Sequence, residues 1–137
     1  MGGLDFWIGD WDASWDGGTG RNRITREYDG HVVVERFEAG PPEPFTGFSL
    51  SVADAEGTGW RQTWVDSTGN YWAFLGGPKP DGSFVFATPN RVDADNVWKR
   101  MIFANIEPDT FDWRWESSMD EQEWIPRWEI SYRRRRP

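Results

Sequence analysis

The sequence predicts an all-β protein, an antiparallel up-and-down meander of about ten strands that closes into a barrel after a short N-terminal helical turn. Three observations support this prediction. Helical periodicity is almost absent, apolar and polar residues alternate along short runs, and turn-forming residues return about every 10–13 positions. The 15 Gly and 9 Pro fall mostly between the apolar runs, where tight turns need them.

The elements follow in order along the chain. The segment from Leu4 to Ile8 is expected to form the helical turn. Strands are expected wherever an alternating run lies between two turn signals. These runs cover residues 10–16, 21–28, 31–38, 46–54, 59–66, 70–77, 83–88, 96–106, 111–118 and 123–134.

Alternation also predicts which side chains face inward, because successive side chains of a strand point to opposite faces. Pro126 removes one ladder donor, so a bulge or an edge position is expected there in the last strand. In chain order, the faces expected to point inward are Trp11-Ala13-Trp15, Asn22-Ile24-Arg26, Val33-Glu35-Phe37, Gln62-Trp64, Trp113-Trp115-Ser117 and Trp128-Ile130.

The chain is expected to form a single domain over residues 1–137. It contains no internal repeat and no change of composition that would mark a linker. Closure of the meander removes exposed strand edges. It also explains an unusual composition, in which aromatic residues reach 17% although hydrophobic residues are only 37%. The interior of a barrel this wide is filled by bulky rings or holds one small ligand.

Charge and cysteine content exclude several classes of function. The net charge of −8 disfavours nucleic acids and anionic membranes as partners. The basic run Arg133 to Arg136 is expected to be a solvated tail. The absence of Cys excludes disulfides, thiolate metal sites and a Cys nucleophile. With neither an apolar span nor a signal-peptide pattern in the sequence, a cytoplasmic protein is expected.

The N-terminal motif Gly9-x-Trp11 follows the expected helical turn and enters the first strand. It resembles the Gly-x-Trp motif of lipocalins and their calycin relatives. The resemblance implies that Trp11 closes one barrel end and that a basic residue of the last strand packs on its ring. Arg133 or Arg134 is the candidate, and such a cation–π contact contributes roughly 0.5–2 kcal/mol.

Over most of its length the chain resembles a family of uncharacterised bacterial calycin-like domains. The matching segments are Phe6-Trp7-Ile8-Gly9-Asp10-Trp11, Gln62-Thr63-Trp64-Val65-Asp66 and Trp115-Glu116-Ser117-Ser118-Met119-Asp120 with Trp124. Membership implies the barrel and no activity. The related haem-binding nitrobindin group needs a proximal His late in the chain, whereas the single His here is His31. Neither haem, another cofactor nor a metal ion is therefore expected.

The leading functional expectation is binding of a small apolar or aromatic ligand inside the barrel, without catalysis. Glu35 and Arg26 lie on adjacent strands, so they can instead form a satisfied internal ion pair. The residues expected at the ligand site are Trp15, Arg26, Glu35, Phe37, Gln62, Trp64, Trp113, Trp115 and Trp128.

Two alternatives stay open at this point. An enzyme of the same fold, such as a cyclase, isomerase or hydrolase, would use Glu35 as acid or base, with Gln62 or Arg100 steadying negative charge. A barrel filled by its own rings would instead be a structural or homodimerisation domain. The strand pair at 96–106 and 111–118 would then supply an interface rich in Trp and Arg.

Overall fold

Ten antiparallel strands close into one barrel in the computed structural model, which describes residues 3–57 and 59–136. A 3-10 turn, η1 (Asp5–Trp7), precedes them. The strands are β1 (Gly9–Trp15), β2 (Gly18–Glu27), β3 (Val32–Ala39), β4 (Phe45–Ala53), β5 (Trp60–Asp66), β6 (Tyr71–Pro78), β7 (Phe84–Ala87), β8 (Trp98–Ala104), β9 (Thr110–Ser118) and β10 (Ile125–Arg134).

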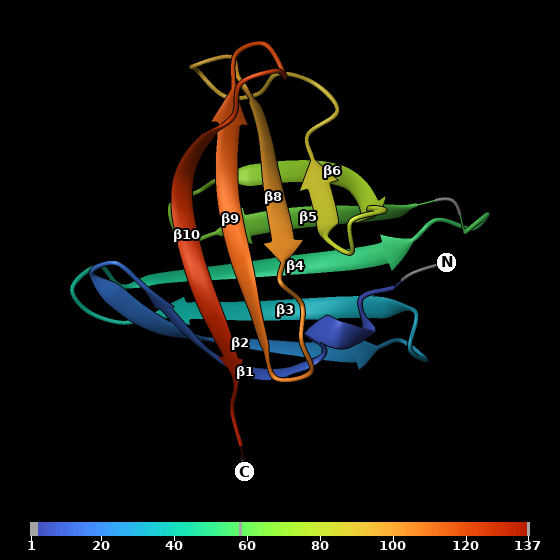
Figure 1. Ribbon diagram of the computed structural model, residues 1–137, viewed down its shortest axis with the longest axis vertical. Coiled ribbons are helices and arrows are strands. Elements are labelled where there is room, and N and C mark those ends of the chain that lie inside the picture. Colours follow the sequence, from blue (N-terminus) through green and yellow to red (C-terminus); the bar gives the residue numbers. More distant parts are fainter. Residues whose placement is uncertain (1–2, 58, 137) are drawn as a thin grey trace.

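Each strand pairs with its neighbours in sequence, and β10 pairs with β1 to close the barrel. In Figure 1, β8 to β10 stand upright in front of β1 to β5, which run across the page, so opposite walls of the barrel cross. The predicted fold is confirmed. The largest error in a strand boundary is at β2, which was expected from residue 21 and begins at Gly18. No helix in the described ranges is long and apolar enough to cross a membrane.

Period-two alternation builds the interior. Along β1, Trp11 and Ala13 are buried while Asp12 and Ser14 are exposed. The predicted irregularity at Pro126 is confirmed, because the β9–β10 register shifts between Pro126 and Trp128.

The middle of the inner face of β4 is made of small residues. Gly47, Ser49 and Ser51 are all buried on this face. A Cβ atom at Gly47 would overlap the indole of Trp64 on the neighbouring strand. The small side chains therefore leave the space that the large rings of β5 occupy.

A cluster around Trp11 closes the end of the barrel at which the chain enters β1. The Trp11 indole Nε1 donates to the Trp7 carbonyl at 2.8 Å, and the Arg134 guanidinium lies 4.3 Å from the Trp11 ring. The same guanidinium donates to the carbonyl oxygens of Ile8 at 2.7 Å and Pro108 at 3.0 Å. Arg134 thus ties the N-terminal turn to the β8–β9 connection.

Of the two candidates for the partner of Trp11, Arg134 and not Arg133 packs on the ring. Trp11 is the direct register partner of Arg134, so alternation turns the Arg133 side chain outward into solvent. The basic run is also not a free tail. Arg135 pairs with Asp12, and Arg136 pairs with Asp109.

Candidate functional site

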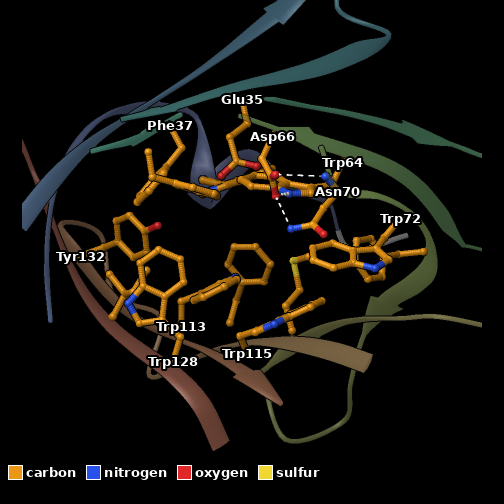
Figure 2. Close-up of a pocket in the computed structure, with 16 residues that line it drawn as sticks. Glu35, Phe37, Trp64, Asp66, Asn70, Trp72, Trp113, Trp115, Trp128 and Tyr132 are labelled. Carbon is orange, nitrogen blue, oxygen red and sulfur yellow. Dashed lines mark hydrogen bonds between the residues drawn. The ribbon is translucent and has the colours of Figure 1, made fainter. Parts of the chain in front are cut away.

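A cavity of about 190 Å³ lies inside the barrel, between the Trp11 cluster and the loops that follow β3, β5 and β9 (Figure 2). The interior is therefore not completely filled by its own side chains. The cavity is lined by Trp7, Glu35, Phe37, Phe45, Trp64, Asp66, Asn70, Trp72, Phe74, Met101, Phe103, Trp113, Trp115, Trp128, Ile130 and Tyr132.

The cavity has a buried inner end and a more accessible mouth. Trp7, Phe74 and Phe103 are buried at the inner end. Trp64 and Trp72, from adjacent positions on β5 and β6, are only half-buried at the mouth. The cavity is therefore more exposed where Trp64 and Trp72 line it.

Ring faces and edges form the walls, and the rings hold one another in fixed orientations. Trp113 and Trp115 are parallel, with centroids 6.4 Å apart. Trp128 meets Trp113 edge-on at 5.9 Å, and Trp72 lies 5.1 Å from Trp115. Such contacts restrict ring rotation, so the shape of the cavity is largely set before any ligand binds.

Glu35 is the buried polar group of the inner end, with only 8% of its surface exposed. Its carboxylate accepts hydrogen bonds from Ser49 Oγ at 2.7 Å and Asn22 Nδ2 at 2.8 Å. Burial raises the pKa of Glu35, and these two hydrogen bonds oppose the rise without cancelling it. Burial, together with the charge of Glu35, also raises the pKa of Tyr132 well above its ordinary value.

Asp66 is the carboxylate of the mouth. It accepts hydrogen bonds from Trp64 Nε1 at 2.8 Å and from Asn70 Nδ2 at 3.1 Å. Thr68 Oγ1 donates a third at 2.7 Å. Burial acts to raise the pKa of Asp66, but these hydrogen bonds outweigh it and hold the pKa below its ordinary value. Asp66 therefore stays ionised at neutral pH and fixes the orientation of the Trp64 indole.

A second aspartate holds the Trp72 indole from outside the cavity. Trp72 Nε1 lies 3.0 Å from Asp93 Oδ1, and Lys99 Nζ lies 2.8 Å from Asp93 Oδ2. The Lys99 ammonium also lies 5.0 Å from the Trp72 ring centroid and 5.7 Å from that of Trp115. Two rings of the cavity wall thus already contact a cation of the chain itself.

The structure brings six of the nine sequence-predicted ligand residues together at the cavity: Glu35, Phe37, Trp64, Trp113, Trp115 and Trp128. Trp15 packs behind the wall, with its ring 5.2 Å from Trp128. Gln62 is buried but does not line the cavity, and its Nε2 donates to Ser51 Oγ at 2.9 Å.

The prediction that Arg26 faces the interior is wrong. Arg26 lies near the end of β2, beyond the packed rings, and its exposed side chain pairs with Asp5 and donates to the Gly30 carbonyl. The internal Glu35–Arg26 pair therefore does not form. Asn22 and Ser49 take the place of Arg26 as partners of Glu35.

Arg100 does not face the cavity either. Met101 and Phe103 line the cavity from β8, and alternation turns Arg100 to the outer face. There its Nε donates to Glu116 Oε1 at 2.7 Å, and its guanidinium lies 4.0 Å from the Trp124 ring. The acid–base set of Glu35 with Gln62 or Arg100 is thus not assembled around one space.

Several lining residues were not among the predicted ligand residues. Ile130 was predicted to face inward with Trp128, and extending the same alternation along β10 would also have found Tyr132. Asp66 ends β5 and has the same parity as Gln62 and Trp64, so extending that alternation would have found it too. Asn70 lies in the following turn and carries no periodic signal. Trp72 could be placed only once the β5–β6 register paired it with Trp64.

Two further features of the described ranges bear on alternative functions. They contain no group of three or more His, Cys, Asp or Glu side chains that could hold a metal ion, and His31 is exposed in the β2–β3 turn. Trp113 and Trp115 point inward, so the outer face of β8 and β9 does not present these rings to a partner.

Comparison of the chain with protein-family models gave no match, and comparison with curated proteins gave none either. The resemblance to calycin-like domains therefore stays a prediction that rests on the motifs quoted above. Function has to be argued from the cavity and the groups that face it.

Proposed function

We propose that the barrel binds a small, largely apolar molecule built on one ring inside the Trp-lined cavity. The volume of about 190 Å³ supports this size class. A cavity of roughly 150 Å³ in another protein holds benzene, whereas sites for drug-sized ligands measure about 300–1,000 Å³. A single ring with a short substituent is the ligand that matches this space.

One observation carries the proposal: an accessible, pre-shaped apolar cavity contains a small number of convergent polar groups. Figure 2 shows the Glu35 and Tyr132 side chains beside the same space, with Trp113, Trp115 and Trp128 on the side opposite Glu35. In small-molecule sites, apolar walls supply affinity while such polar groups fix orientation.

The test is a titration of the protein with benzyl alcohol and with toluene, followed by calorimetry and by ligand-observed NMR. Saturable binding to one site is expected. Ile130→Phe places a larger side chain in the cavity. It should weaken binding by about tenfold or more, because the new ring occupies space that the ligand needs.

Ile125→Phe is the matched control, since Ile125 lies on the same strand but is exposed and outside the cavity. This variant should bind both probes as the unmodified chain does. The proposal fails if neither probe binds at saturating concentration, or if Ile130→Phe binds them unchanged while its circular dichroism shows a folded barrel.

A further inference from the structure

We propose that the ligand is an organic cation, a protonated amine carried by a single apolar ring, with its ammonium group bound at Glu35 and its ring between the indoles. This inference rests on the proposed function and deepens it by naming the ligand class. Three independent features of the cavity point to it: spare hydrogen-bond acceptors, unbalanced negative charge and the arrangement of ring faces.

Acceptors outnumber donors at the inner end. An ionised carboxylate offers about four acceptor positions, and Glu35 uses two of them for Ser49 and Asn22. The buried Oδ1 atom of Asn22, beside this carboxylate, accepts no hydrogen bond from the described residues. The Tyr132 hydroxyl accepts one weak hydrogen bond from Asn22 Nδ2 at 3.4 Å. Two donors lie at this end, the buried Trp7 Nε1–H, which has no hydrogen-bond partner in the described residues, and the Tyr132 hydroxyl. They are fewer than the free acceptor positions, and an ammonium group brings three N–H donors for the remainder.

The charged groups that line the cavity are all of one sign. Glu35 and Asp66 are carboxylates, and no Lys, Arg or His is among the described lining residues. The nearest cation contacting the walls, Lys99, is already paired with Asp93. A buried carboxylate without a cationic partner is costly, so a cation that binds beside Glu35 stabilises its ionised form.

The rings supply the second part of cation recognition. The face of an indole carries negative electrostatic potential, and cages of aromatic rings bind ammonium groups. Trp64 and Trp72 each donate their indole N–H to a carboxylate, Asp66 and Asp93 respectively, which increases the electron density of the rings. The contact of Lys99 with Trp72 and Trp115 shows that two indoles of the cavity wall hold an ammonium group.

The experiment compares benzylamine with benzyl alcohol, which have the same shape and number of heavy atoms but differ in charge at neutral pH. Calorimetry should show benzylamine binding about tenfold or more tightly, as expected for a charge-assisted hydrogen bond added to cation–π contacts. Glu35→Gln should remove this preference, so that benzylamine binds this variant no more tightly than benzyl alcohol does.

Glu38→Gln is the matched control. Glu38 lies on the same strand as Glu35 but is exposed, so this substitution removes one acidic side chain as Glu35→Gln does without altering the cavity. It should keep the preference for benzylamine. If Glu38→Gln loses the preference as fully as Glu35→Gln does, the overall charge is responsible and the inference fails.

The possible outcomes separate the inference from the proposed function. If benzyl alcohol binds the unmodified chain as tightly as benzylamine, the cation inference is overturned while ligand binding stands. If neither compound binds, both fall. The comparison of the two ligands on the unmodified chain uses no variant, so it decides the question even if Glu35→Gln does not fold.

Discussion

Glu35 is a buried acid, and its ionisation lowers the stability of the folded barrel. Its pKa is raised by burial, so the folded state holds its proton more tightly than the unfolded state does. Below the ordinary Glu pKa of about 4.3, the carboxyl is protonated in both states and carries no penalty. As the pH rises from there through the raised pKa, the folded state alone resists ionisation, and the free energy of unfolding falls.

Glu35→Gln should therefore gain stability over the unmodified chain as the pH rises through this window, with the difference levelling off above the raised pKa. Urea unfolding at a series of pH values measures it. The other titratable groups that line the cavity are Tyr132 on β10 and Asp66 on the opposite side. Neither changes its charge in this pH window, because the pKa of Tyr132 is raised and the pKa of Asp66 is lowered, both away from the window. Glu38→Gln should show no such trend, and a constant difference for Glu35→Gln would contradict the assignment.

Arg134 makes the closed end depend on one side chain. Arg134→Ala removes the contact with Trp11 and the hydrogen bonds to the carbonyls of Ile8, Phe6 and Pro108. Losing the cation–π contact and these hydrogen bonds together should lower the free energy of unfolding by about 2–4 kcal/mol. Arg133→Ala, one residue earlier and exposed, should change stability by less than about 0.5 kcal/mol. Thermal and urea unfolding measure both variants. If Arg134→Ala and Arg133→Ala destabilise the barrel equally, the lost charge and not the contact with Trp11 is responsible.

At the scale of the strand, Gly47 in the middle of the inner face of β4 makes room for the Trp64 indole. Gly47→Ala should displace this ring, break its hydrogen bond to Asp66 and destabilise the barrel by roughly 1–3 kcal/mol. The indole N–H resonance of Trp64 in NMR spectra reports the displacement. Gly77→Ala on β6 is the control, because a Cβ there meets nothing within 4 Å. An unshifted Trp64 resonance in Gly47→Ala would show that the ring does not need this space.

The strands also show how far a sequence of this kind can be read. Alternation and turn residues identified all ten strands and correctly predicted that Trp11, Glu35, Trp64 and Trp113 face inward, because burying one face fixes the register of a strand.

Alternation cannot predict where along a strand the packed interior ends. That is why Arg26, with the same parity as Asn22 and Ile24, lies in solvent next to Asp5. Alternation also cannot predict Asn70, whose hydrogen bond to Asp66 depends on how the turn after β5 folds.

At the scale of the whole molecule, closure means that none of the ten strands is a free edge. The β1–β10 seam joins residues about 120 positions apart in sequence, such as Trp11 with Arg134. Backbone amides of β1 and β10 that bond across this seam should therefore exchange with solvent as slowly as those of β2 and β3. Hydrogen exchange followed by NMR tests this. Rapid exchange confined to β1 and β10 would indicate an open sheet in solution.

The same seam determines how the barrel responds to mechanical load. β1 and β10 are antiparallel, so the start of β1 and the end of β10 lie together at the closed end. Tension applied through the chain on either side of the barrel pulls these two ends apart and loads the ladder one hydrogen bond at a time, in an unzipping rather than a shearing geometry. The bonds of Arg134 to Ile8 and Phe6 lie where that tension enters, so this guanidinium is among the first contacts to carry the load.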